Sequence, residues 1–289
     1  MANYDYYVKS KDFFFCEGSF IRTFTYNNYG YPIHEHDFYE INVVIEGNGT
    51  HTIHNRSLSV KKGDVFLISP NTPHSYVNGN NLTVYHIVVS RELIEKHYED
   101  GKRTNGFLMF MEIEPFLRTI DGNNVYLHLT PLELQKFTEE IADSSLENEN
   151  GRRPTLPLNI HIFFKILYRF SMLFYNQVNS GHSENMKHYE QVLNAMEYIH
   201  TNFDQKIPLE LLCKICYLSR STLLRAFEAI CGCSPLYYHQ KYRAKKAVSM
   251  IESSDYTKTR IAHLCGYYDL SHMERCIEKY LNSEPEMSE

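Results

Sequence analysis

Residues 218–227 read LSRSTLLRAF, and residues 266–277 read GYYDLSHMERCI. The two stretches belong to an internal repeat in which an apolar residue, an arginine and a second apolar residue recur at an offset of 50 residues. The matched pairs are Leu223 and Met273, Arg225 and Arg275, and Phe227 and Ile277. The segments before them match at an offset of 49 and pair Leu212, Cys213, Ile215 and Cys216 with Ile261, Ala262, Leu264 and Cys265. The extra residue falls in the turn between the matched blocks, so each copy is predicted to be a helix, a tight turn and a second helix.

The second helix of each copy has an apolar and a polar side. Leu223 and Phe227 lie four residues apart and are expected to anchor the first such helix in its core. The polar residues then face outward near the helix start, where a groove-binding helix meets bases and phosphates. The residues expected to contact DNA are Arg220, Ser221, Thr222, Leu224, Arg225, Ser271, His272, Glu274, Arg275 and Lys279. The alternative is a solvated helix face, and the repeat favours DNA.

The last third of the chain, residues 192–285, resembles the DNA-binding domain of the AraC/XylS family of transcription regulators. Besides the two helices, the stretch Gly232-x-Ser234-Pro235-x-x-Tyr238 follows the family pattern. The resemblance implies two recognition helices, joined by a helix that contains Ala244, Ala247, Val248 and Ile251. The chain departs from the family at Leu224 and Glu274 (usually small and polar), at Glu228 and Glu278 (usually basic) and at Asn282 (usually Gly). These departures leave the predicted fold intact, and they are expected to weaken the second contact surface.

The formal charge of −6 lies entirely in the first 186 residues. From Lys187 onward there are 13 basic and 13 acidic residues. A neutral domain can bind DNA when its basic groups share one face, although its non-specific affinity is weak. Six of the seven cysteines lie in the C-terminal third, which is not the pattern of a secreted disulfide framework. Cys213 and Cys216 have zinc-like spacing, but they fall inside a predicted helix, where cysteine packs as a small apolar residue.

The first part of the chain is predicted to be mostly strands. Residues 41–45, 65–68 and 84–89 are short, β-branched or aromatic segments bounded by Gly, Pro and Asn. They are too closely spaced for βαβ units, which favours an antiparallel barrel or sandwich. Residues 144–154 and 179–185 are polar and are predicted to be loops. The predicted domains are residues 1–130 (sensing barrel), 131–180 (helical pair) and 181–289 (DNA-binding domain).

The helical pair begins at Thr130-Pro131-Leu132-Glu133, which has the capping pattern of a helix start. Phe137 and Ile141 continue its apolar face. The second helix has apolar residues at helical spacing, namely Ile160, Phe163, Phe164, Leu167, Phe174 and Val178. This wide aromatic stripe is expected to pack partly on the barrel and partly against a second subunit, which predicts a homodimer.

Residues 34–40, HEHDFYE, with Gly47 after them, resemble the first motif of the cupin superfamily. Gly63-Asp64, followed by Pro70, Pro73-His74 and Asn78, resembles the second. In metal-dependent cupins the residues that match His34, His36, Glu40 and His74 hold a divalent metal. Two of the histidines are two residues apart and share one face of a strand, and the set suits Zn, Fe, Mn or Ni. The alternative is that these side chains contact an organic effector without metal, or support the barrel.

These observations predict an α+β protein of several domains. A cupin-like antiparallel β-barrel with two helices would precede an all-α domain with two helix-turn-helix motifs. The resemblances imply a transcription regulator that binds double-stranded DNA and responds to a small molecule such as a sugar, and that contacts RNA polymerase if it activates. The alternative is a metal-dependent cupin enzyme with a DNA-binding tail. The helix-turn-helix repeat favours a non-enzymatic regulator without catalytic residues. No signal peptide or membrane span is evident, so a cytoplasmic protein is expected.

Overall fold

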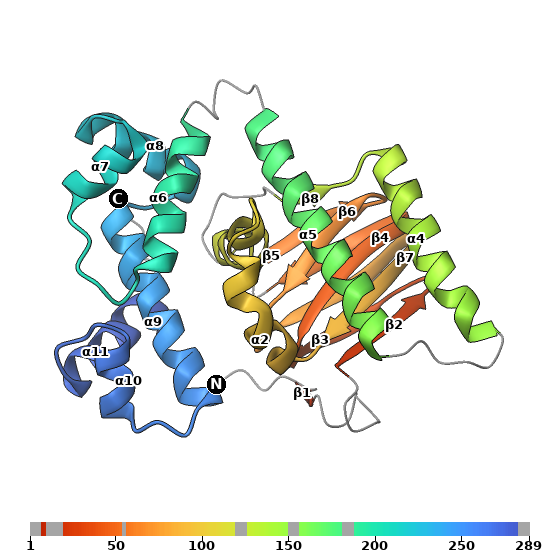
Figure 1. The fold of residues 1–289 in the computed structure, drawn as a ribbon, viewed down its shortest axis with the longest axis horizontal. Helices are drawn as coiled ribbons and strands as arrows, with labels where there is room; N and C mark the ends of the chain where they lie inside the picture. The colour runs from red at the N-terminus through yellow and green to blue at the C-terminus, as the bar shows by residue number, and fades with distance from the viewer. Residues whose placement is uncertain are drawn as a thin grey trace. The chain divides into compact units, whose positions relative to one another are not determined.

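The computed structural model describes residues 7–9, 20–53, 56–118, 126–149, 156–180 and 188–282. The chain forms two compact units, the first from residues 1–119 and 124–177 and the second from residues 120–123 and 178–289. Cys16, Lys187, Pro285 and the predicted loop residues 150–154 and 181–185 lie outside the described residues. The fold class predicted from the sequence is confirmed, because a strand-rich unit precedes an all-helical one (Figure 1).

The first unit is built on an eight-stranded sheet. The three predicted strand segments lie in its fourth, sixth and seventh strands. The strands are β1 (Tyr7–Val8), β2 (Ile21–Tyr26), β3 (Tyr31–His36), β4 (Tyr39–Ile53), β5 (Arg56–Lys61), β6 (Asp64–Ile68), β7 (His74–Val89) and β8 (Leu127–His128). All the pairs are antiparallel except that of β1 with β3.

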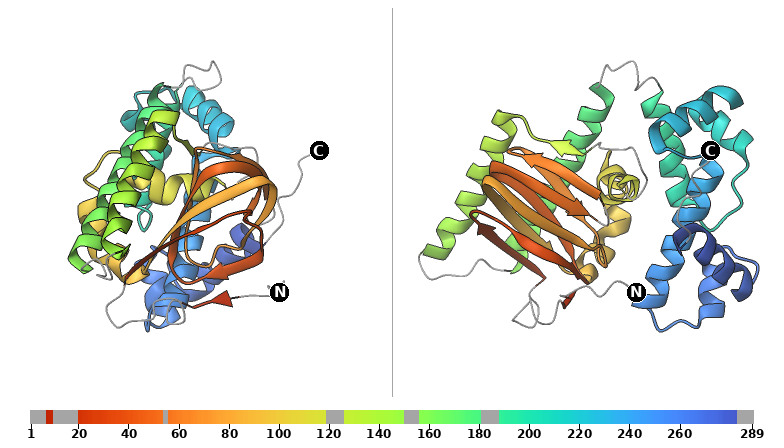
Figure 2. Two further views of the ribbon diagram at one scale, coloured as in Figure 1. Left: turned by 90° about the vertical axis from the view of Figure 1, so that its right-hand side faces the viewer. Right: turned by 180° about the vertical axis from the view of Figure 1, so that it is seen from behind.

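The two long strands, β4 and β7, connect the two parts of this sheet. The first half of β4 pairs with β6 and with the second half of β7, and the second half of β4 pairs with β5 and with the first half of β7. The register shifts between Val44 and Gly49, where the halves meet. Gly47 has φ of 73°, and a Cβ there would lie 2.2 Å from the carbonyl oxygen of Asn81. Only glycine fits this bend, which curls the sheet around its inner face (Figure 2).

Two helices, α4 (Pro131–Glu149) and α5 (Leu156–Ser180), cover the outer face of the sheet (Figure 1). The predicted capping box is present, because the backbone N–H of Thr130 donates to Glu133 Oε2 and the N–H of Glu133 donates to Thr130 Oγ1. The helices bury Phe137, Phe163, Phe170 and Phe174 among others, and the Tyr85 ring of β7 packs edge-on against Phe137. Three of the six residues of the predicted apolar stripe, Phe163, Leu167 and Phe174, therefore belong to the core of this unit.

The two predicted loops start at residues that still belong to the preceding helices. Helix α4 continues through residues 144–149, and α5 continues to Ser180. Leucine and glutamate within 144–149 are good helix formers and allow α4 to continue. Residues 91–117 also form α2 (Arg91–Gly101), the π-helix η1 (Met109–Ile113) and α3 (Glu114–Leu117), which were not predicted. The Ser90 hydroxyl accepts from the N–H of Leu93, a local start signal for α2.

The second unit contains only helices among its described residues. They are α6 (Tyr189–Thr201), α7 (Leu209–Cys216), α8 (Arg220–Cys231), α9 (Pro235–Ser253), α10 (Lys258–Leu264), α11 (Leu270–Ile277) and the π-helix η3 (Glu278–Asn282). The two helix-turn-helix motifs are α7–α8 and α10–α11, and α9 joins them (Figure 1). The apolar positions matched in the repeat are equivalent in the structure, because Leu223 and Met273 are both fully buried. No described helix is long and apolar enough to cross a membrane.

Candidate functional site

The inner face of the sheet holds a pocket centred on the carboxylate of Glu40. Its side chain comes from the start of β4 and is buried. Oε2 lies 3.0 Å from His36 Nε2 and 3.3 Å from His74 Nε2, and Oε1 lies 2.6 Å from His86 Nδ1. The His34 ring lies 4.1 Å from the His74 ring, because the two residues are directly opposite on β3 and β7. The fold therefore brings together all four residues that the sequence singled out.

Three of the imidazoles are oriented in the same way. Nδ1 of His34 faces the carbonyl oxygen of Pro32 at 3.0 Å, that of His36 faces Phe38 at 2.8 Å, and that of His74 faces Thr72 at 2.9 Å. A carbonyl oxygen only accepts hydrogen bonds, so each Nδ1 carries the proton. When such a ring is neutral, its Nε2 has no proton and carries a lone pair. In His36 and His74 this lone pair faces the carboxylate of Glu40. The carboxylate oxygen also carries lone pairs, so the arrangement suits a cation placed between them.

His86 on β7 is a site residue that sequence reasoning missed. Its Nδ1 donates to Glu40, its ring stacks on Phe24 at 4.7 Å, and its Nε2 is buried without a hydrogen-bond partner. The signal in the sequence was the period of two in β7, which places His86 on the same face as Val84 and Val88. His86 also lies directly opposite Asn42 on β4, whose Oδ1 has no hydrogen-bond partner either.

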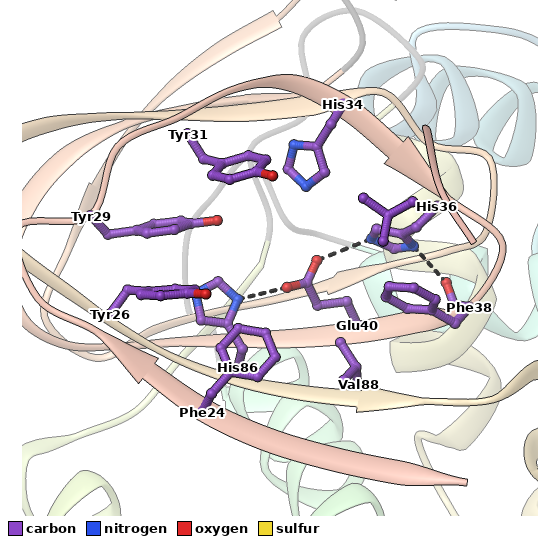
Figure 3. A pocket seen from close by; sticks show the side chains of 11 residues that line it. Phe24, Tyr26, Tyr29, Tyr31, His34, His36, Phe38, Glu40, His86 and Val88 are labelled. Atoms are coloured by element: carbon purple, nitrogen blue, oxygen red, sulfur yellow. Dashed lines mark hydrogen bonds and ion pairs between the residues drawn. The ribbon is translucent and has the colours of Figure 1, made fainter. Parts of the chain in front are cut away.

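A row of aromatic rings forms the other side of the pocket, and sequence reasoning missed it as well. Tyr26 and Tyr29 stack at 5.5 Å, and Tyr29 and Tyr31 stack at 6.3 Å (Figure 3). The pocket encloses about 430 Å³ including its open mouth. Its lining is Val8, Phe24, Tyr26, Tyr29, Tyr31, His34, His36, Phe38, Glu40, His86 and Val88.

Burial and the Glu40 carboxylate set the charges in this pocket. Burial alone would raise the pKa of Glu40, but its close contacts with the rings of His36, His74 and His86 lower it well below its usual range. Burial, with the neighbouring His74, lowers the pKa of His34 to about 4. At neutral pH the pocket therefore combines one carboxylate with a neutral imidazole at His34 and a stack of phenol rings. Such a lining can hold a polar organic molecule or a cation. Among the described residues, His34, Glu40 and His74 have ligand atoms within 4.8 Å of one another, and His36 is not part of that group.

The predicted DNA contacts lie on the outer faces of the two second helices. In α8, Arg220, Ser221 and Arg225 are exposed, while Thr222 and Leu224 are half-buried. The helix is capped by the Ser219 hydroxyl, which accepts from the N–H of Thr222 and also contacts its hydroxyl. Arg220 reaches Glu210 at 3.3 Å, and both side chains are about 70% exposed.

Helix α11 repeats this arrangement. Ser271, Glu274 and Arg275 are exposed, His272 is half-buried, and Asp269 caps the helix through the N–H of His272. Nε of Arg275 lies 3.3 Å from the carbonyl oxygen of Ser271, as Nε of Arg225 lies 3.4 Å from that of Ser221. Lys279 is exposed on the π-helix η3, beyond the end of α11, with its ammonium 5.3 Å from the Tyr280 ring. The two helices therefore present their first two turns in equivalent ways and differ after residue 277.

Two family models match the chain. An AraC-like ligand binding domain matches residues 18–153, and a helix-turn-helix domain matches residues 212–287. The HTH-type transcriptional activator RhaS of Mannheimia succiniciproducens is 25% identical over 256 residues, which cover 88% of each chain. RhaS of an Escherichia coli strain is 22% identical and covers 88% of this chain and 86% of its own. Among solved structures, ToxT from Vibrio cholerae aligns over 92% of this chain and 97% of its own, with 10% identity and a TM-score of 0.36.

Proposed function

This chain belongs to the AraC family of DNA-binding transcription regulators with an N-terminal ligand-binding domain, and we propose that a small polar molecule in the pocket around Glu40 controls how α8 and α11 engage a specific operator. One observation supports the DNA surface above all. Arg225 and Arg275 occupy equivalent, exposed positions and contact equivalent carbonyls in the two copies. Equivalent arginines within the first two turns of two exposed helices suit two major-groove contacts.

A binding experiment with the full chain tests this surface. A duplex recovered by in vitro selection with the wild-type protein would serve as the probe. Arg225→Ala and Arg275→Ala should each weaken binding by about 1–3 kcal/mol, which is the contribution of one good base contact. Arg103→Ala is the matched control, because that side chain is 82% exposed in the first unit and should leave binding unchanged. Wild-type affinity in both helix variants would reject the surface.

The lining of the pocket suits a small hydroxylated effector, and we favour a sugar. Stacked tyrosines offer flat apolar faces to the C–H groups of a ring, while Glu40 and His34 offer hydrogen-bonding groups for hydroxyls. His86 Nε2, which is buried without a hydrogen-bond partner, adds one acceptor from the pocket lining. Calorimetry with a panel of monosaccharides and sugar acids should identify a ligand whose binding is lost in Tyr29→Ala. A ligand that binds equally well to that variant would not occupy this pocket.

A divalent metal is a second candidate for the same pocket, as a ligand or as a partner of the effector. The common orientation of His34, His36 and His74, with Nδ1 on backbone carbonyls, supports it, since metal-ligating histidines are usually held in this way. His34, His74 and Glu40 would hold the ion, which would supply a Lewis-acid centre for effector oxygens. Purified protein should then contain near-stoichiometric Zn, Fe, Mn or Ni, and His74→Ala should lose it. His161→Ala, at an exposed position of α5, is the control for adventitious binding.

The remaining assignments follow from this function. The relatives are transcription activators by name, which supports a regulator over a cupin enzyme, and an activator would also contact RNA polymerase. Leu132 and Met172 are exposed on α4 and α5, which supports a homodimer through the outer face of this helix pair. Light scattering would test it, with a monomeric mass for Met172→Lys as the expected result. A protein that binds chromosomal DNA would work in the cytoplasm.

A further inference from the structure

Each helix-turn-helix turn carries one highly exposed tyrosine. Tyr217 is 94% exposed and Tyr268 is 86% exposed, the two highest values among the large hydrophobic side chains of the described residues. Tyr217 lies between α7 and α8, and Tyr268 lies between α10 and α11. Such exposed rings contribute little to the stability of a fold, because they remove little apolar surface from water.

Tyr217 adopts a backbone conformation that disfavours tyrosine. Its φ of 53° and ψ of 35° lie in the left-handed region, which costs a side chain other than glycine about 1–2 kcal/mol. The equivalent residue of the second copy is Gly266, with φ of 73°. A glycine would therefore suit residue 217 better, and the exposed ring of Tyr217 gains no packing that would offset the cost. The fold does not explain the presence of a tyrosine here.

Tyr268 is the additional residue of the second turn. The N–H of Leu218 donates to the carbonyl of Cys213, and the N–H of Tyr267 donates to the carbonyl of Ala262, so Leu218 and Tyr267 are equivalent. The caps that follow, Ser219 and Asp269, are also equivalent. Between Tyr267 and the helix cap Asp269 the second copy therefore has one residue, Tyr268, that has no counterpart in the first copy. The two turns thus acquire an exposed phenol by different routes, one by a strained backbone and one by an insertion.

We propose that Tyr217 and Tyr268 contact the sugar–phosphate backbone of DNA beside each recognition helix. This inference rests on the proposed function, in which α8 and α11 enter major grooves. The residues directly before a recognition helix lie next to the groove edge when that helix is docked, and a tyrosine hydroxyl can donate to a phosphate oxygen. DNA is the partner that fits, because both copies present the same group at the same end of the same helix.

Conservative variants test the contact in the full chain. The probe is the duplex recovered by in vitro selection, with affinity measured at several salt concentrations. Tyr217→Phe and Tyr268→Phe should each bind about 10- to 100-fold more weakly, the effect of losing one hydrogen bond to a charged phosphate. The slope of log affinity against log salt should stay unchanged, because no charge is lost, whereas Arg225→Ala should reduce it by about one if Arg225 also neutralises a phosphate. Tyr256→Phe is the matched control, a 47% exposed tyrosine between α9 and α10, and should bind normally.

Tyr217→Gly separates the contact from the fold. It should raise the thermal midpoint of the second unit by relieving the left-handed strain, and it should weaken DNA binding at least as much as Tyr217→Phe does. Wild-type affinity in the Phe and Gly variants, with weakened binding in Arg225→Ala, would overturn this inference and leave the proposed DNA surface intact. Normal binding in Arg225→Ala and Arg275→Ala as well would instead reject the DNA surface itself.

Discussion

Arg243 of α9 donates its Nε–H to the carbonyl oxygen of Phe203 at 2.8 Å. The same guanidinium donates to the carbonyl of Gln205 at 2.7 Å, approaches that of Gly266 at 3.4 Å and lies 5.5 Å from the Tyr267 ring centre. One buried side chain of the connecting helix thus holds the loop after α6 and the turn of the second helix-turn-helix motif. Gly266 completes the contact, since a Cβ there would lie 1.7 Å from the carbonyl oxygen of Asp204.

Replacing Arg243 should therefore destabilise the second helix-turn-helix motif. Arg243→Lys keeps the charge but loses the planar fork that reaches two carbonyls at once. The expected loss is about 2–4 kcal/mol in the free energy of unfolding of the second unit, since buried carbonyls are left unpaired. Thermal unfolding measures it, and Arg260→Lys, at an exposed position of α10, is the control. An unchanged midpoint would show that the Arg243 contacts contribute little.

Acid should destabilise the second unit through His239. Burial, with the nearby Arg243, lowers its pKa from 6.5 to about 4, even though the hydrogen bond to Phe203 opposes this shift. Between these values the unfolded chain binds a proton that the folded chain does not, so stability falls as pH falls below about 6.5.

His239→Gln keeps a side-chain N–H for the Phe203 carbonyl and removes the titrating group. The wild type should lose stability relative to this variant by up to about 1.4 kcal/mol per pH unit on acidification. Denaturant unfolding at about pH 7.5 and about pH 5 measures the difference, with the exposed His263→Gln as control. A constant difference across this range would mean that His239 titrates normally in the folded protein.

Glu40→Gln distinguishes a metal-binding pocket from a metal-free one. In the metal-free pocket the amide fits well, because its oxygen can accept from His86 Nδ1 and its N–H₂ can donate to the Nε2 lone pairs of His36 and His74. Stability without metal should therefore change by less than about 1 kcal/mol. A metal that binds the folded wild type raises its midpoint by mass action, and the variant should lose this rise. Equal responses of both proteins to added Zn or Mn would place the metal elsewhere.

Sequence periodicity was most informative where side chains recur at a fixed spacing. The repeat of 49 and 50 residues located α7, α8, α10 and α11, because both copies place equivalent apolar residues, such as Leu223 and Met273, in equivalent cores. The histidines and the glutamate at the spacing of the cupin motifs identified one side of the pocket. His86 and the tyrosine stack were missed because they come from β2, the β2–β3 turn, β3 and β7, and only pairing between strands brings them to Glu40. Helices 91–117 were missed because their apolar residues give no single long periodic stripe.

The two motifs should leave two separate footprints on DNA. They are joined by the single helix α9, so α8 and α11 should enter successive major grooves about one turn, roughly 34 Å, apart. Hydroxyl-radical footprinting should show two protected patches per subunit on one face of the duplex. A single patch, unaffected by Arg275→Ala, would mean that α11 does not bind DNA. The matched Arg225→Ala protein should lose the other patch.

Leu224 and Glu274 occupy equivalent places, one residue before the exposed arginines of α8 and α11. Leu224 is half-buried and can offer only part of its side chain to a thymine methyl group, whereas Glu274 is exposed and can accept from the amino group of cytosine. Lys258 lies 3.9 Å from Glu274, which offsets some of its repulsion from phosphate. We therefore expect a cytosine preference at the base pair that Glu274 faces and a weaker thymine preference at the one that Leu224 faces.

Single-base variants of the selected duplex separate a base contact from general repulsion. Glu274→Gln should remove a discrimination of about 1–3 kcal/mol at one base pair and leave the others unchanged, and Leu224→Ala should remove a smaller one. Glu278→Gln is the control, because that exposed acidic residue follows α11 and should alter all duplexes alike. If Glu274→Gln instead tightens binding to every duplex equally, Glu274 repels DNA without reading a base, and the cytosine preference is wrong.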